Sequence, residues 1–120
     1  MAIIYRIVDH NRRGVYCAAG NTPSLWSKVY DNSWSNDRQP SPCNDGMPDV
    51  KDEHRFGFKT PEQLKRWTES KYCRELLTRH GGMVNIYSVP DKHIVEGRHQ
   101  VAFIRRNAKL IGRVPVTHFD

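Results

Sequence analysis

The chain has 120 residues and a net charge of +6, and hydrophobic residues make up 38% of it. This length fits one domain, residues 1–120, with a modest core. The sequence has no apolar run that could cross a membrane and no N-terminal signal segment, so we expect a cytoplasmic protein without a membrane partner. The pI near 9.5 favours acidic partners such as nucleic acid, an acidic protein or a phosphorylated ligand.

Cysteine and histidine usage argues against a disulfide scaffold and against a metal centre. Cys17, Cys43 and Cys73 form an odd, widely spaced set without a C-x-x-C pair, and the six histidines are scattered. Because no ligand spacing typical of zinc occurs, we expect no metal.

The first predicted element is a strand over Ile3–Val8, where β-branched and aromatic residues dominate. Arg6 is the odd member, since it shares a face with Ile4 and Val8. If both faces of the strand are buried, this arginine must be paired or must face a ligand. The alternative is that its stem crosses the sheet edge while its charged head reaches water.

A turn at residues 10–14 and a short strand at residues 15–19 are expected next. Arg12 and Arg13 lie on this turn, either as a solvated pair or as a contact for an anion. From about residue 20 to 54 no periodicity persists, and prolines with Ser, Asn and Asp predict a long irregular loop. Trp26 and Trp34 argue against full disorder, so we interpret the loop as an ordered flap. It would cover a pocket, meet a partner protein or only patch a thin core.

The clearest element is a main helix over about residues 60–80. Thr60 can accept a hydrogen bond as the N-cap, and Gln63 can complete a capping box. Gly81 and Gly82 can end the helix in the left-handed conformation.

The apolar residues of this helix form two stripes rotated against each other. One holds Leu64 and Trp67, and the other holds Tyr72, Cys73, Leu76 and Leu77. Either the helix curves around a core or it breaks near Ser70 into two short helices. Both interpretations place Trp67 and Leu76 against a sheet.

Three strands are predicted after the helix, over residues 83–89, 99–105 and 109–116, with a turn or helical turn at residues 92–97. Pro115 implies that the last strand is an edge or ends there. The order β-β-loop-β-α-β-β-β predicts the α+β class, with one main helix packed on a mixed or antiparallel sheet.

Motifs for nucleotide, acyl-transfer or zinc-protease chemistry are absent from the sequence. Basic residues near the C-terminus are candidates for contacting nucleic acid: Arg105, Arg106, Lys109 and Arg113. Few aromatic residues interleave with them, so the sequence does not indicate a stacking platform for single strands.

Several short stretches carry a resemblance to a known group of proteins: Tyr5-Arg6, Gly14 to Tyr16, Phe56 to Phe58 with Gln63-Leu64 and Trp67, Tyr87 to Pro90, and Gln100 to Phe103. In this layout the chain resembles small, mostly uncharacterised proteins of tailed phages and prophages. The resemblance implies an accessory protein in a bacterial host cell that binds a host protein or ribonucleoprotein. Host-takeover and anti-defence proteins such as CRISPR inhibitors act in this way. Trp26, Trp34, Arg12 and Arg13 are the candidate partner-binding residues.

The order of elements is also distantly similar to ADP-ribosyltransferase-like domains, in which a first-strand Arg or His holds NAD and a late strand carries a glutamate. Arg6 matches the first position, and Tyr16 is a further candidate for holding the cofactor. Gln100 stands where the catalytic glutamate is expected, and a glutamine cannot act as a base. The resemblance therefore implies an NAD-binding enzyme or pseudo-enzyme, whereas the accessory-protein hypothesis, which we rank first, requires neither a cofactor nor catalysis.

Overall fold

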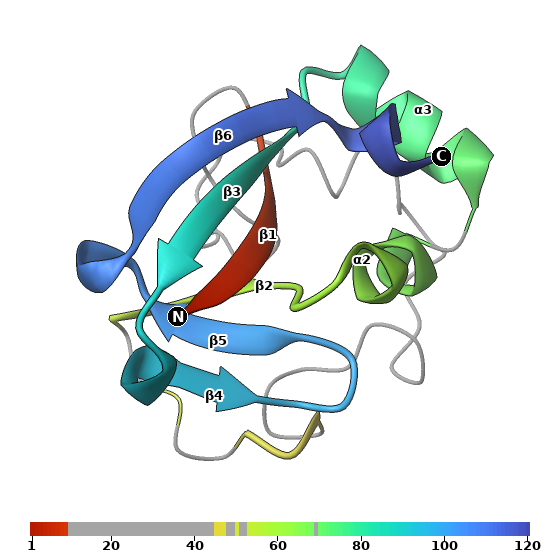
Figure 1. Ribbon diagram of the computed structural model, residues 1–120. Coiled ribbons are helices and arrows are strands. Elements are labelled where there is room, and N and C mark those ends of the chain that lie inside the picture. The colour runs from red at the N-terminus through yellow and green to blue at the C-terminus, as the bar shows by residue number, and fades with distance from the viewer. Residues whose placement is uncertain (10–44, 48–49, 51–52, 69) are drawn as a thin grey trace, which may run out of the picture.

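The computed structural model describes residues 1–9, 45–47, 50, 53–68 and 70–120 (Figure 1). The strands and helices in these residues run in the order β1 (Ala2–Val8), β2 (His54–Gly57), α2 (Pro61–Thr68), α3 (Lys71–Arg79), β3 (Met83–Val89), β4 (Ile94–Glu96), β5 (Val101–Ile104) and β6 (Lys109–Pro115). Short 3₁₀ turns lie at η2 (Asp91–His93), η3 (Arg105–Asn107) and η4 (Val116–Phe119). The predicted strand at residues 15–19 and almost all of the predicted loop lie outside the described residues.

The predicted α+β class is confirmed, but the strands form two sheets where one was expected. One sheet has the order β1-β3-β6 and the other β2-β5-β4, and every pairing in both is antiparallel. The sheets meet at Tyr5 and Phe58, whose backbones exchange hydrogen bonds of 2.8 and 2.7 Å. This junction holds the two sheets side by side (Figure 1).

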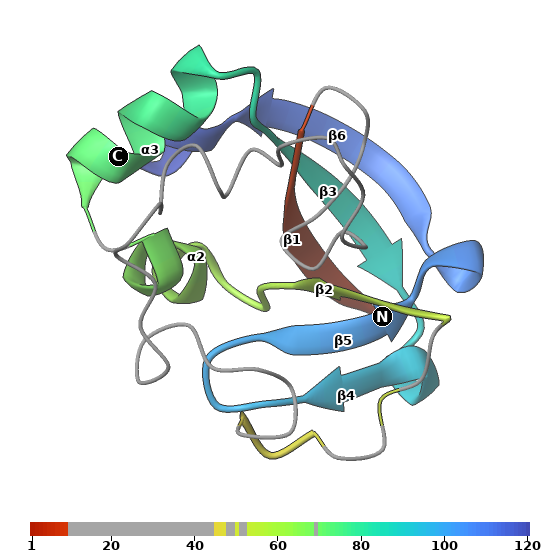
Figure 2. The same ribbon diagram turned by 180° about the vertical axis from the view of Figure 1, so that it is seen from behind.

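The sequence of strand β1 is almost continuously apolar, which fits a strand with both of its faces covered. Ile7 belongs to the core cluster with Trp67 and Leu77 of the helices. Ile4 belongs to a second cluster with Phe103 of the other sheet. The view from behind shows both helices on the same side of the molecule (Figure 2).

The predicted main helix is two helices, which confirms the interpretation with a break near Ser70. Helix α2 ends at Thr68, and Ser70 is the N-cap of α3, where its Oγ accepts a hydrogen bond of 3.1 Å from the N–H of Cys73. Tyr72, a member of the second apolar stripe, is 68% exposed and so is not part of the core. The predicted burial of Trp67 is confirmed, since it is 1% exposed.

The predicted helix ends are confirmed, except that Gln63 bonds the residue before the N-cap and not the N-cap itself. Thr60 Oγ1 accepts from the N–H of Gln63 at 3.1 Å, as expected of an N-cap. Gln63 Oε1 accepts from the N–H of Lys59 at 2.8 Å, one residue before the cap. Gly81 has a φ of 91° and ends α3 in the left-handed conformation.

The chain after the helices follows the predicted strands with one correction. Residues 92–97 hold strand β4, which pairs with β5, in addition to part of a 3₁₀ turn. Three residues are too few to show a period of two, so the sequence did not reveal this strand. Strand β6 lies at the edge of its sheet and ends at Pro115, as predicted.

A buried ion pair ties the end of the chain to both helices. Arg74 of α3 donates through Nε to Asp120 Oδ1, and the two side chains are 7% and 10% exposed. Its Nη1 also donates to Lys65 O at 3.3 Å and to Thr68 Oγ1 at 3.2 Å. Arg74 thus joins α2, α3 and the C-terminal residue.

Candidate anion-binding site

The first sheet presents a polar row on the face opposite the helices. In the strand register Asn85 of β3 stands between Arg6 of β1 and Arg113 of β6. Because cross-strand partners share a face of the sheet, these three side chains lie on the same side. Tyr87 and Leu110 form the next pair along this face, two residues further along β3.

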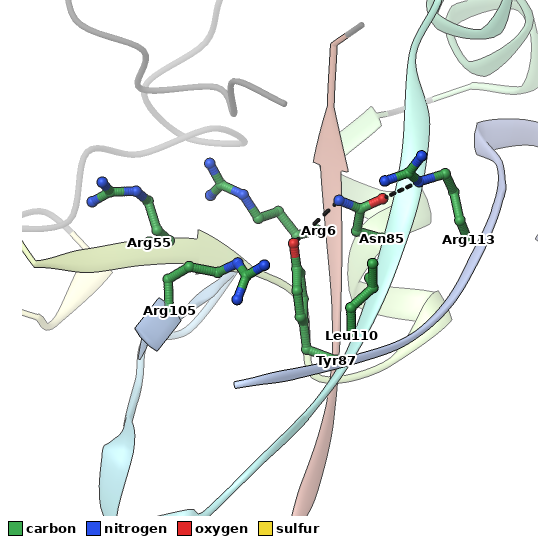
Figure 3. Close-up of a pocket in the computed structure, with 7 residues that line it drawn as sticks. All are labelled: Arg6, Arg55, Asn85, Tyr87, Arg105, Leu110 and Arg113. Atoms are coloured by element: carbon green, nitrogen blue, oxygen red, sulfur yellow. Dashed lines mark hydrogen bonds between the residues drawn. The ribbon is translucent and has the colours of Figure 1, made fainter. Parts of the chain in front are cut away.

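The second sheet completes a cavity of about 120 Å³ beside this row (Figure 3). Arg55 comes from β2, and Arg105 follows β5 at the start of η3. Figure 3 shows Arg6, Arg55 and Arg105 to one side of Tyr87 and Arg113 to the other. The described residues that line it are Arg6, Arg55, Asn85, Tyr87, Arg105, Leu110 and Arg113, and we call this space the arginine cavity.

Arg6 is the buried member of the set, with 7% exposure, whereas the other three arginines are exposed. Its Nη1 donates to the carbonyl oxygen of Phe56 at 2.9 Å. Burial removes water from the guanidinium and, together with smaller contributions from the charges of Arg55 and Arg105, lowers the pKa of Arg6 to about 10. Tyr87, and to a smaller extent Asp9, act in the opposite direction. Arg6 is therefore still charged at pH 7, in a setting that disfavours its charge.

A chain of hydrogen bonds holds the far side of the cavity in place. Arg113 Nε donates to Asn85 Oδ1 at 2.8 Å, and Asn85 Nδ2 donates to Tyr87 Oη at 3.1 Å. A phenol that accepts in this way can still donate its own proton. The guanidinium of Arg105 lies over the ring of Tyr87, with Cζ 4.6 Å from the ring centroid, which is a cation–π geometry.

The charge of the arginine cavity is strongly one-sided. Among the residues that the structure describes, its lining holds four guanidinium groups and no carboxylate. A guanidinium carries five N–H donors in a planar fork that matches the oxygens of phosphate or carboxylate. Arg106 lies outside the lining, and its Nη1 is 3.2 Å from the carboxylate of Glu53. The arrangement is chemically suited to holding an anion.

The structure brings together candidates that came from two separate hypotheses. Arg6, the candidate NAD ligand, shares the cavity with Arg105 and Arg113, which were candidates for nucleic acid. Arg106 and Lys109 are exposed and do not line it.

Sequence reasoning missed Arg55, Asn85 and Tyr87 as members of the site. The one available signal was the alternation of β3, which puts Asn85 and Tyr87 on one face.

Gln100, the candidate catalytic residue, lies in a different environment. It is 1% exposed, it is not part of the cavity lining, and its N–H donates to Asp45 Oδ2 at 3.2 Å. The same carboxylate accepts hydrogen bonds of 3.0 Å from the N–H of His99. Four further predicted site residues and one predicted cofactor residue lie outside the described residues: Arg12, Arg13, Trp26, Trp34 and Tyr16.

The part of the chain that the structure describes contains no group of three or more His, Cys, Asp or Glu side chains that could hold a metal ion. Nor does any helix there have the length and apolar character needed to span a membrane.

Comparison with known proteins gives one match, to a family described as "Bacteriophage T4 Y00F protein", whose model matches residues 1–117. Neither the curated proteins nor the solved structures contain a match.

Proposed function

Because the chain belongs to the family of the bacteriophage T4 Y00F protein and is therefore a phage protein, we propose that it is an accessory protein that binds and modulates a host macromolecule through the arginine cavity. The observation that carries this proposal is the set of four guanidinium groups that the described residues place around one cavity. The group recognised on the partner is accordingly an anion.

The energetics of Arg6 support a binding role for the cavity. Removing a charge from water costs free energy unless a counter-charge or hydrogen bonds replace the water. Arg6 is buried near Arg55 and Arg105, which lower its pKa further. An anion in the cavity would offset both the lost hydration and the repulsion between the arginines. The protein is thus arranged to gain free energy when the anion enters.

The charge of the whole chain supports an acidic partner. A net charge of +6 attracts acidic surfaces over several ångströms and speeds their association. Host nucleic acid, ribonucleoproteins and acidic host proteins all meet this requirement. Modulation of such a partner would serve host takeover or anti-defence, including inhibition of CRISPR complexes.

The test is capture from a lysate of a susceptible host bacterium with the tagged full-length chain. We expect a specific host component that elutes as salt is raised and that Arg6→Met no longer retains. The matched control is Arg79→Gln, which removes one positive charge from the exposed end of α3 and should leave capture unchanged. Capture that is equal for Arg6→Met and the wild type would overturn the proposal, as would the absence of any specific component.

NAD binding is a second candidate function, favoured by one observation. Arg6, the residue that the ADP-ribosyltransferase resemblance assigns to the cofactor, lines an anion-binding cavity that could hold the pyrophosphate of NAD. This hypothesis predicts that millimolar NAD raises the melting temperature of the wild type and not that of Arg6→Met. An unchanged melting temperature of the wild type would remove it.

A further inference from the structure

We propose that the arginine cavity binds the terminal phosphate monoester of a nucleic-acid strand. This inference rests on the proposed function, and it names the chemical group and the class of partner that the cavity selects.

The charge of the cavity favours a doubly charged group. Four guanidiniums line the space, and Arg55 and Arg105 are near enough to Arg6 for their charges to add to the lowering of its pKa by burial. A phosphate monoester carries about −1.5 to −2 at pH 7, because its second pKa is about 6. A phosphodiester of the strand interior, like a carboxylate, carries only one negative charge. The monoester therefore relieves more of the repulsion among the arginines.

The position of one buried arginine among three exposed ones favours the end of a nucleic-acid strand over its interior. Arg6 is buried, while Arg55, Arg105 and Arg113 are exposed around it. A terminal phosphate has one ester link, so it can project inward to Arg6 while the strand leaves past the exposed arginines. An internal phosphodiester has two links, and both would have to leave through the same opening of a cavity of about 120 Å³.

The surroundings of the cavity favour nucleic acid as the carrier of the phosphate. Arg106, next to the lining residue Arg105, is already paired with Glu53 at 3.2 Å. Lys109, next to Leu110, is exposed and the chain carries a net charge of +6, so positive charge extends beyond the cavity. Such residues can follow the remaining phosphates of a strand. Tyr87 is 3% exposed and lies beneath Arg105, so its ring is not available to stack on a base. Recognition would therefore depend on the strand end and hardly on the base sequence.

The experiment compares single strands of one sequence by fluorescence anisotropy with the full-length chain. The strands carry a 5′-phosphate, a 3′-phosphate or hydroxyls at both ends, and the dye sits at the opposite end or on an internal base. We expect one or both phosphorylated strands to bind about tenfold or more tightly than the hydroxyl strand, as one additional charged contact with several donors implies. The two phosphorylated strands show which end fits.

Competition and pH identify the group that is recognised. Inorganic phosphate should displace the phosphorylated strand more effectively than sodium chloride does at equal ionic strength. The preference for the phosphorylated strand should grow as the pH rises from about 5 to 7.5, because the phosphate loses its second proton near pH 6. Arg6 stays charged over this range, since its pKa is about 10.

Variants separate the cavity from general electrostatic attraction. Arg6→Met should abolish the preference for phosphorylated strands. Arg105→Gln, at an exposed position, should reduce this preference without lowering the stability of the fold. Arg106→Gln, just outside the lining, should weaken binding of all strands by the same factor and preserve the ratio. The distant Arg79→Gln should preserve it as well.

Equal affinities for phosphorylated and hydroxyl strands would overturn the inference. Tighter binding of a phosphoserine peptide than of any phosphorylated strand would also overturn it, because the carrier would then be a protein. Neither result contradicts the proposed function. That proposal is contradicted only if no host component is captured or if its capture does not depend on Arg6.

Discussion

Arg6 and Arg74 are both buried, with exposures of 7% and 6%, but their partners differ. Arg74 forms an ion pair with Asp120 and donates to two further oxygens. Arg6 donates to one carbonyl oxygen, that of Phe56, and faces a cavity lined by other arginines. Replacing each with methionine, which has a similar length and no charge, should therefore have very different effects on stability.

For Arg74→Met the expected loss in the free energy of unfolding is about 3 kcal/mol. Removing one member of a buried ion pair leaves the other charge without compensation, which typically costs about 3–5 kcal/mol. The lower end applies because the side chain of Asp120 is 10% exposed and so keeps some contact with water. The contacts of Arg74 with Lys65 and Thr68 are lost as well.

For Arg6→Met two opposing contributions to the free energy of unfolding nearly cancel. The charged form is favoured less in the folded state, where the pKa is about 10, than in the unfolded state with its ordinary value of 12.5. Below pH 10 this difference disfavours folding by about 3 kcal/mol, and methionine removes it. Loss of the hydrogen bond to Phe56 O costs about 1.5–3 kcal/mol in the other direction. We expect a net change between zero and about 1.5 kcal/mol of added stability.

The assay is urea unfolding at pH 7, in a buffer free of phosphate and sulfate, followed by tryptophan fluorescence. Trp67 lies in the core next to Phe58 and reports on its disruption. Equal and large destabilisation by both variants would refute the reasoning, because Arg6 would then be a structural residue and not one held ready for an anion.

Further predictions concern the local packing of the fold. Gly57→Ala would place a Cβ 2.7 Å from Ile4 Cγ2 and 2.8 Å from the carbonyl oxygen of Tyr5. We therefore expect the free energy of unfolding, measured by thermal unfolding, to fall by about 1–3 kcal/mol. A variant as stable as the wild type would contradict the close approach of β1 and β2. Ser70→Ala removes the cap of α3 and should lower stability by about 1 kcal/mol, whereas Ser70→Thr should retain most of it. An equal loss in both Ser70 variants would show that the hydroxyl has no capping role.

Much of the fold was open to prediction because its signals are local. Thr60, Ser70 and Gly81 mark helix ends through side-chain capping or backbone freedom, and each acts within one turn of its own position. The sequence could not decide between a curved and a broken helix, since that choice depends on tertiary contacts such as those of Arg74 with Thr68.

The division into two sheets could not be predicted because strand pairing is not local. Strand β2 pairs with β5, from which both helices and two other strands separate it along the chain. Alternation of residues shows which side chains share a face of one strand, but it does not say which strand lies beside it.

The candidate site was predictable only at its buried member. Arg6 stands out as the single charge in an apolar strand, which marks it as needing a partner or a ligand. Its neighbours in the cavity come from β2, η3 and β6, and only the register with Asn85 brings Arg113 beside it. Before the pairing is known, these arginines look like ordinary basic residues of the surface.

The most direct test of the account is thermal unfolding of the wild type and Arg6→Met in phosphate and in chloride at equal ionic strength. A ligand that binds only the folded state stabilises it in proportion to the logarithm of its concentration once the site is nearly saturated. The account predicts that rising phosphate raises the melting temperature of the wild type and leaves that of Arg6→Met at its chloride value. Equal shifts in the two proteins, or no shift in the wild type, would contradict the claim that the arginine cavity is an anion-binding site.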